Sequence, residues 1–182
     1  MLIQEKQIKM KDERTAILRN PVEADALDCL EHIKTVSGET EFLVRCPEEC
    51  NMTEQQELDW INSVRESDTV CNLVCEVNGE IAGNCEIRFT NRVKLGHRAV
   101  IGIALKKAYW GLGIGTAMFE EMIHIAQQRQ GVTILELEFM EGNDRARALY
   151  EKMGFRIVSE KPNAYRLKDG SMRKEFYMQM EL

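Results

Sequence analysis

Apolar residues recur along the chain in two patterns, the alternate spacing typical of strands and the three-to-four spacing typical of helices. Gly, Pro and Asn separate these runs and mark the turns between them. Read in order, the pattern predicts the elements βααβββαβαββ, with strands at residues 14–19, 69–77, 80–89, 99–105, 132–140, 155–160 and 176–181 and helices at 22–36, from 53, 114–131 and 143–153. We expect a flexible extension at residues 1–13, and a loop or an irregular continuation of the preceding strand at 162–170.

Short local signals fix parts of this assignment. Asn78-Gly79 separates two alternating runs, which predicts a hairpin with a two-residue turn. Thr53 followed by Gln56 matches a capping box, in which the two residues satisfy each other's backbone amides at the start of a helix. Ser37-Gly38 predicts the end of the preceding helix.

Composition favours one folded domain over residues 14–182. A chain of 182 residues, 44% of them hydrophobic, can bury a core large enough for independent stability. The net charge of -6 gives no basic field, which disfavours nucleic acid as a partner and weakly favours cationic substrates such as amines. The chain has no run of about 18 apolar residues that predicts a membrane span, and its polar beginning does not resemble a secretory signal. We therefore expect a cytoplasmic protein.

The six cysteines all lie in the first half of the chain, and we interpret them as reduced thiols. Two C-x-x-x-C pairs, Cys46/Cys50 and Cys71/Cys75, raise the alternative of a metal site. On a shared strand, Cys71 and Cys75 would lie about 13 Å apart, too far to bind one metal ion. We therefore expect no metal.

Three glycines at alternate positions, Gly111, Gly113 and Gly115, stand between an apolar strand and a predicted helix. Such a loop exposes backbone amides at a helix start, where the helix dipole also favours an anion. The sequence therefore predicts a phosphorylated ligand. A dinucleotide fingerprint would need glycine in place of Thr116 or Met118, and a P-loop would need a lysine before its Ser or Thr. Both nucleotide alternatives are thus disfavoured.

The glycine loop and one later segment together match the signature of a known family. Residues 110–115, WGLGIG, fit the pattern Arg/Gln-x-x-Gly-x-Gly/Ala except at the first position, Trp110. Residues 143–155, NDRARALYEKMGF, fit Asn-x-x-Ala-x-x-Leu-Tyr-x-x-x-Gly-Phe without a gap. The chain therefore resembles the GNAT superfamily of acetyl-CoA-dependent N-acetyltransferases, specifically over residues 99–155 and topologically elsewhere. The resemblance implies an α/β (α+β) fold, a mixed and mostly antiparallel seven-stranded sheet flanked by about four helices.

The resemblance also implies how acetyl-CoA, the acetyl-donor substrate, would bind. In the family the strand before the loop separates from its neighbour, and the pantetheine arm lies in the gap. Ile103 and Leu105 occupy the positions whose backbone groups pair with that arm. The pyrophosphate would then meet the loop amides of Leu112, Gly113, Ile114, Gly115 and Thr116. Trp110 cannot supply the ionic contact of the usual Arg or Gln, and Lys106 and Lys107 either supply it or are solvated surface lysines.

Two side chains match catalytic positions of the family. Tyr150 matches the tyrosine that protonates the departing thiolate as general acid, with a packing role as its alternative. Glu138 lies five residues before Asn143 and matches a base in relatives resembling ribosomal-protein alanine N-acetyltransferases. It would act directly or through a water, and its alternative is a structural or solvent-facing carboxylate. The family implies that a backbone N–H near Ile103 stabilises the oxyanion.

Several other polar residues are secondary candidates. Asn143 matches a position that contacts CoA, and as a helix N-cap it would have a structural role as well. His97 is a second titratable group near the loop strand, or an ordinary turn residue. The remaining candidates are three acidic residues that would attract a cationic acceptor, and two helical histidines that look incidental: Glu41, Glu48, Glu49, His32 and His124.

The expected activity is acetyl transfer to a primary amine, on a peptide N-terminus or a small molecule, by direct attack in a ternary complex. By analogy with the family we expect a homodimer, with neither nucleic acid nor membrane as partner. Two alternatives stay open at this point. One is a non-catalytic acyl-CoA sensor or interaction module of the same fold, and the more distant one is a dinucleotide-binding protein.

Overall fold

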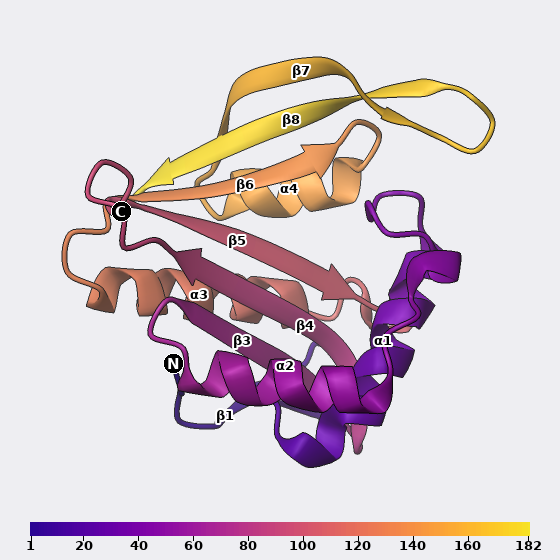
Figure 1. The fold of residues 1–182 in the computed structure, drawn as a ribbon, viewed down its shortest axis with the longest axis vertical. Helices are drawn as coiled ribbons and strands as arrows, with labels where there is room; N and C mark the ends of the chain where they lie inside the picture. Colours follow the sequence, from indigo (N-terminus) through magenta and orange to yellow (C-terminus); the bar gives the residue numbers. More distant parts are fainter.

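Eight strands form one sheet, and helices cover both of its faces (Figure 1). The computed structural model describes residues 1–182. The strand order is β1-β2-β3-β4-β5-β6-β8-β7, and only β5 and β6 are parallel neighbours. The strands are β1 (Lys6–Lys9), β2 (Thr15–Arg19), β3 (Val70–Val77), β4 (Glu80–Phe89), β5 (Arg98–Leu105), β6 (Ile134–Met140), β7 (Arg156–Arg166) and β8 (Met172–Glu181), and the helices are α1 (Ala26–Glu39), α2 (Glu54–Glu66), α3 (Ile114–Gln128) and α4 (Asp144–Lys152).

The expected sheet and four helices are confirmed, with one strand more than the seven predicted. The additional strand, β1, lies within residues 1–13, which were expected to form a flexible extension. It pairs with β2 from Lys6 opposite Leu18 to Lys9 opposite Thr15. Its sequence, KQIK, is mostly polar, as is common in edge strands that resist further pairing. The same polarity removes the apolar alternation from which a strand is predicted.

Two element boundaries also differ from expectation. Helix α1 continues through Ser37-Gly38 to Glu39, because Val36 and Ser37 are buried and this packing outweighs the low helix propensity of glycine. Strand β7 continues to Arg166, so of the two alternatives for residues 162–170, a loop or an irregular continuation, the structure has the continuation up to Arg166. A register shift between Lys161 and Tyr165 takes Pro162 out of the hydrogen-bonded ladder, so the strand tolerates it.

The two faces of the sheet bury cores of very different size. The main core, beneath α3 and α4, is a cluster of 27 buried residues that includes Ile87, Phe119 and Leu135. The separate cluster beneath α1 and α2 has five buried residues, among them Ile61 and Val74. In Figure 1, α2 crosses in front of β3, whereas α3 lies behind the sheet. The face under α1 and α2 is therefore filled less completely.

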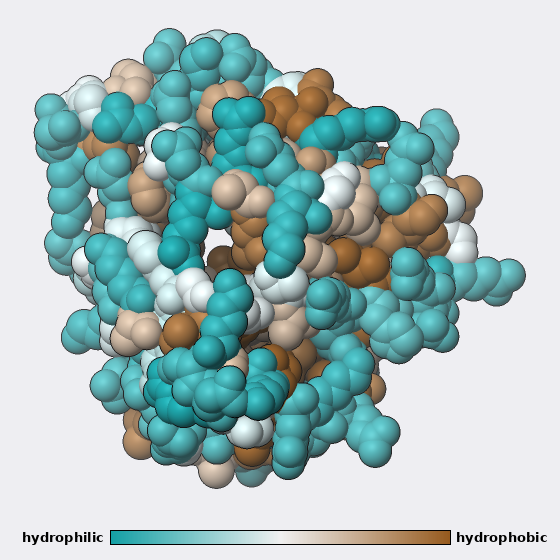
Figure 2. All heavy atoms as spheres, turned by 180° about the vertical axis from the view of Figure 1, so that it is seen from behind, coloured by the Kyte–Doolittle hydropathy of each residue, from teal (hydrophilic) through white to brown (hydrophobic).

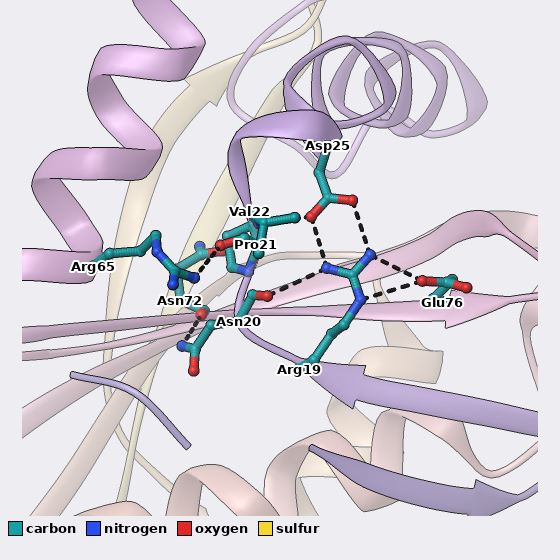
Figure 3. Close-up of polar contacts among 8 residues, drawn as sticks. All are labelled: Arg19, Asn20, Pro21, Val22, Asp25, Arg65, Asn72 and Glu76. Atoms are coloured by element: carbon teal, nitrogen blue, oxygen red, sulfur yellow. Dashed lines mark hydrogen bonds and ion pairs between the residues drawn. The ribbon is translucent and has the colours of Figure 1, made fainter. Parts of the chain in front are cut away.

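Arg19, at the end of β2, ties this thinner layer to the sheet (Figure 3). Its guanidinium donates to both carboxylate oxygens of Asp25, at 2.6 and 2.8 Å, and to Glu76 of β3 at 2.9 Å. Burial alone would raise the pKa of Asp25, but hydrogen bonds from Arg19 and a backbone amide outweigh it and lower that pKa. From α2, Arg65 donates to the Pro21 carbonyl at 2.8 Å. The corner between β2 and α1 is thus fixed beside α2.

Strands β5 and β6 are hydrogen-bonded only where they begin. Residues 98–100 pair with 134–136, and beyond them the two strands separate. Farther along, β5 keeps only its partner β4, and β6 keeps only β8. The sheet therefore opens between its two middle strands.

A buried carboxylate holds the point where these strands part. Arg98 of β5 donates to Glu136 of β6 at 2.6 Å and to the Tyr177 hydroxyl of β8 at 2.7 Å. Gln179 of β8 donates to the same carboxylate at 2.9 Å. Burial alone would raise the pKa of Glu136, but hydrogen bonds from Arg98, Tyr177 and Gln179 outweigh it and lower that pKa. We call these four residues the Arg98 clamp.

We predict that Arg98→Ala lowers the free energy of unfolding at pH 7 by about 2 kcal/mol, because it leaves Glu136 buried without its cation. The loss is below that of a fully buried pair, since the Arg98 side chain is 36% exposed. Urea unfolding followed by circular dichroism measures it. The lowered pKa of Glu136 stabilises the fold above its unfolded value of about 4.3, and this contribution disappears as the pH falls. The difference between the two proteins should therefore shrink toward pH 4.

The matched control is Arg156→Ala, which removes an arginine from an exposed pair with Glu181. Its free energy of unfolding should stay nearly unchanged, since exposed ion pairs contribute little. Equal losses in the two variants would contradict a special role for the Arg98 clamp.

Candidate functional site

A cavity of about 960 Å³ begins where β5 and β6 separate and extends over the sheet face beneath α1 and α2. Figure 2, the view from behind, shows the opposite side of the molecule, where a hollow near the middle has hydrophilic residues around its rim and apolar surface inside. Most of the predicted site residues line the cavity, namely Ile103, Leu105, Gly113, Gly115, Thr116, Glu138, Asn143 and Tyr150. The side chains of Leu112 and Ile114 do not; Ile114 is fully buried in the main core.

The free edge of β5 forms one wall of the cavity. The Lys106 amide donates to the Ala82 carbonyl at 3.0 Å, which makes Leu105 and its partner Gly83 a non-hydrogen-bonded pair. The backbone groups of Leu105 and, two residues earlier, Ile103 therefore face away from β4. They point to the side that β6 has left, so an extended ligand can pair with the Ile103 backbone groups and the Leu105 amide as a strand would.

The glycine loop leads from β5 into α3 with its amides uncovered. Gly111 and Gly113 have φ of 79° and 95°, a left-handed conformation that favours glycine. Gly113 is the N-cap of α3, and no side chain caps this helix, so its first amides lack intrahelical partners. A Cβ on Gly115 would lie 3.1 Å from Leu149, so glycine here permits the close approach of α4. This geometry suits an anion such as a phosphate.

Trp110 connects this loop to the end of β5. Its indole N–H donates to the Leu105 carbonyl at 2.7 Å. The guanidinium of Arg145, from α4, lies over the indole ring at 4.6 Å from its centre. Arg145 also lines the cavity, so Trp110 places a cation beside the loop although it carries no charge itself.

The two lysines considered as replacements for the missing charge at Trp110, Lys106 and Lys107, do not supply it at the cavity. Lys106 is buried and its ammonium contacts Glu80 at 2.6 Å, which is a structural pair. Lys107 does not line the cavity, and its ammonium lies 5.8 Å from the centre of the Trp110 ring. Besides Arg145, the cavity is lined by Lys152, whose ammonium donates to the Thr116 hydroxyl at 3.3 Å. Neither Arg145 nor Lys152 was singled out from the sequence.

Tyr150 lies in α4 with its ring in an aromatic cluster. Its ring centre is 5.3 Å from that of Phe119 and 5.7 Å from that of Phe139. The residue is 7% exposed and lines the cavity, and its hydroxyl has no hydrogen-bond partner within the protein. Burial raises the pKa of Tyr150 to about 12, so the phenol is protonated at neutral pH. A fixed O–H donor thus remains free at the cavity wall.

Glu138 lies on β6 opposite Tyr177 of β8 and lines the cavity. Partial burial, followed by repulsion from the Glu175 carboxylate, raises the pKa of Glu138. Lys161 acts in the opposite direction without an ion pair. A carboxylate with a raised pKa accepts a proton more readily at neutral pH, which suits a general base.

The other candidates separate into two groups. Asn143 is the N-cap of α4, where its side-chain oxygen accepts from the Ala146 amide at 3.3 Å, and it lines the cavity as well. His97 is exposed just before β5 begins, at the opposite end of that strand from the glycine loop. It does not line the cavity, so it is a turn residue rather than part of this site.

The acidic residues between α1 and α2 contact the chain's own groups. Glu48 pairs with Lys168 at 2.6 Å, Glu41 lies 3.9 Å from Arg173, and Glu49 accepts from a backbone amide. None of the three lines the cavity. The expectation that they attract a cationic acceptor does not fit their positions, because Glu41 and Glu48 contact the β7–β8 hairpin and Glu49 accepts from the Cys46 amide of its own turn.

Two buried polar residues lie at the cavity wall; from the sequence His32 looked incidental, and Glu57 was not singled out. His32 is 1% exposed, its Nε2 lies 3.0 Å from the side-chain oxygen of Asn84, and burial lowers the pKa of His32 to about 4. Glu57 of α2 is 7% exposed. Helical spacing from Cys29 to His32 and from Glu57 to Ile61 would have placed both on the buried faces of their helices.

The structure offers no arrangement for a metal ion among His, Cys, Asp and Glu side chains. All six cysteines are free thiols, and four of them are buried. Burial raises the pKa of Cys75 to about 12, so this thiol is protonated at neutral pH. None of the helices is long and apolar enough to cross a bilayer.

Comparisons with known proteins agree with this geometry. A family model described as the acetyltransferase (GNAT) family matches residues 38–155. The chain is 26% identical over 119 residues to the L-amino acid N-acetyltransferase AaaT of Escherichia coli (strain K12), covering 65% of this chain and 73% of that protein. It is 35% identical over 79 residues to the ribosomal protein bS18-alanine N-acetyltransferase of the same organism, covering 43% and 53%.

Among solved structures, an acetyltransferase of the GNAT family from Streptococcus pneumoniae superimposes with a TM-score of 0.86. Its sequence is 26% identical, and the match covers 92% of this chain and 99% of that one. The likeness therefore extends over the fold as a whole, including the layers outside residues 38–155.

We predict that the carboxyl group of Glu138 titrates above the ordinary value of about 4.3 and that Glu175→Gln lowers its pKa, because the like charge is removed. Carbon-13 NMR titration measures this, with Glu138→Gln identifying the resonance. Glu181→Gln, near the other end of β8, removes an equal charge and should leave the pKa of Glu138 unchanged. An unchanged value in Glu175→Gln would mean that Glu175 does not act on the base.

Proposed function

Because the chain belongs to the acetyltransferase (GNAT) family, we propose that it transfers the acetyl group of acetyl-CoA to a primary amine by direct attack in a ternary complex. The observation that carries the proposal is one continuous cavity. It joins the unpaired edge of β5, the uncovered amides of α3, the Tyr150 hydroxyl and the Glu138 carboxylate. The relatives are named for amino-acid and protein-alanine acceptors, which supports a small-molecule amine or a peptide N-terminus here.

The donor would lie along the edge of β5. Its pantetheine arm pairs with the backbone of Ile103 and Leu105, as an added strand would. Its pyrophosphate meets the amides from Leu112 to Thr116, where the helix dipole favours negative charge. Arg145 and Lys152 supply cations at the same end of the cavity. The indole of Trp110 contributes by holding Arg145 rather than by touching phosphate.

The chemistry needs one base, one acid and one oxyanion donor. The amine nitrogen forms a bond to the thioester carbonyl carbon, and its proton passes to Glu138, directly or through a water. The carbonyl oxygen gains charge and accepts from a backbone N–H near Ile103. As the carbon–sulfur bond breaks, the thiolate takes the Tyr150 proton. Burial raises the pKa of both a phenol and a thiol, so the two groups remain comparable in basicity within the cavity.

We predict that Tyr150→Phe lowers kcat about 100-fold while KM for acetyl-CoA changes little, because the acid acts only as the thiolate departs. Release of CoA thiol during turnover measures both parameters.

Glu138→Gln should lower kcat/KM about 100-fold at neutral pH and remove the acidic limb of the pH profile. Glu160→Gln, on the exposed β7, is the control. Full activity of Tyr150→Phe across the pH range would remove Tyr150 from this role.

We also predict that Gly113→Ala weakens CoA binding about tenfold, since a left-handed conformation costs an L-residue about 1–2 kcal/mol and relaxing it moves the amides. Isothermal titration calorimetry with CoA measures the effect. Gly131→Ala is the matched control, with φ of 86° at the other end of the same helix. It should lose stability without losing CoA affinity. CoA binding without thiol release over a broad amine panel would instead support a non-catalytic acyl-CoA sensor.

A further inference from the structure

Glu57 is a buried carboxylate without a partner of its own. It lies in the first turns of α2 and is 7% exposed. Its side chain has no hydrogen bond, and none of the ion pairs in the protein includes it. The single cation that acts on it is Arg45, which is exposed and acts only through space. Its oxygens are not sealed off, because Glu57 lines the cavity and is absent from the fully enclosed polar groups.

The surroundings of Glu57 make this isolation costly. Cys29, Val74 and Trp60 line the same part of the cavity, between α1, α2 and the sheet. An ionised carboxylate facing such walls loses hydration and gains nothing unless a cation pairs with it. Trp60 stands three residues after Glu57 on the same helix face, where its ring is within reach of a cation bound to that carboxylate. The pair therefore has the chemistry of a site for an ammonium or guanidinium group.

This carboxylate lies at a distance from the reacting end of the cavity. In Figure 1 the first turn of α2 lies toward the same end of the sheet as the end of β5. Helix α2 packs on β3, two strands away from β5 in the order β3-β4-β5. With strands about 4.8 Å apart, β3 and β5 lie about 10 Å apart within the sheet, and Glu57 stands on the helix above it. An amine bound at Glu57 is thus too far away to attack the thioester beside Tyr150.

We propose that Glu57 and Trp60 bind a second cationic group of the acceptor, so that the preferred acceptors are primary amines with another ammonium or guanidinium about six methylenes away. The inference rests on the proposed function and names its substrate class. The first amine reacts between Tyr150 and Glu138, while the second stays charged in the pocket under α2. Arg45 occupies the rim and is not needed for binding.

The test compares 1,6-diaminohexane with hexylamine, which has the same length and one charge less. We expect wild-type kcat/KM to be about tenfold higher for the diamine, since a charge-assisted contact contributes about 1.5–3 kcal/mol. Glu57→Gln should remove this difference by raising the KM for the diamine. The values for hexylamine should change by less than about twofold. Glu54→Gln, exposed in the same first turn of α2, is the matched control and should alter neither acceptor.

A second readout does not depend on turnover. In Trp110→Phe, Trp60 is the single tryptophan left of the two in the chain, so its fluorescence reports ligands at the pocket. Adding 1,6-diaminohexane should change the emission of Trp60. In Glu57→Gln the diamine concentration that gives half of this change should rise about tenfold. Equal kinetics for both amines together with no Glu57-dependent fluorescence response would overturn the inference while leaving acetyl transfer intact. A fluorescence response without thiol release from any amine would instead contradict the proposed function alone.

Discussion

The Arg98 clamp decides where the sheet opens, and the site depends on that position. Glu136 is buried at the point where β5 and β6 part, where Arg98 and Gln179 donate to its carboxylate and Arg98 also donates to the Tyr177 hydroxyl. Up to this point the sheet is continuous, and beyond it the edges of β5 and β6 are free. If the strands stayed paired farther along, the backbone groups of Ile103 would be hydrogen-bonded to β6 and could not bind a ligand. A charged network within an apolar sheet thus produces an unpaired strand edge without unfolding either strand.

The two layers on the sheet have different tasks. The large core under α3 and α4 fixes the glycine loop, Tyr150 and Asn143 as one rigid body, because aromatic rings from α3, α4 and β6 pack together. The small core under α1 and α2 leaves space instead. Arg19 compensates by holding the corner of that layer with hydrogen bonds rather than with apolar contacts. One sheet therefore carries a rigid group of cavity residues on one face and an open chamber on the other.

Most of the fold could be predicted from the sequence, as could most of the residues that line the cavity along the edge of β5, because their signals are local. Glycine spacing, the Asn143 cap and strand alternation each arise from neighbouring residues. β1 could not be predicted, since its polar residues are ordered only by pairing with β2. His32 looked incidental and Glu57 was overlooked, because each is one polar residue within an apolar helical stripe. The partners of Glu41 and Glu48 come from the distant β7–β8 hairpin, which no local pattern connects to them.

The bond from the Trp110 indole to the Leu105 carbonyl has a consequence for selectivity among acyl donors. It joins the glycine loop to the last residue of the strand edge, so in the proposed binding mode it fixes the span from the phosphates to the thioester. In that binding mode the distance between the loop and the strand edge fixes how far the pantetheine arm reaches. Every acyl-CoA would then place its carbonyl carbon at the same depth in the cavity. A longer acyl chain could therefore not be accommodated by a shift of the CoA moiety toward solvent. It must project past Tyr150 into the chamber under α1 and α2, where it would compete with the acceptor for the same volume.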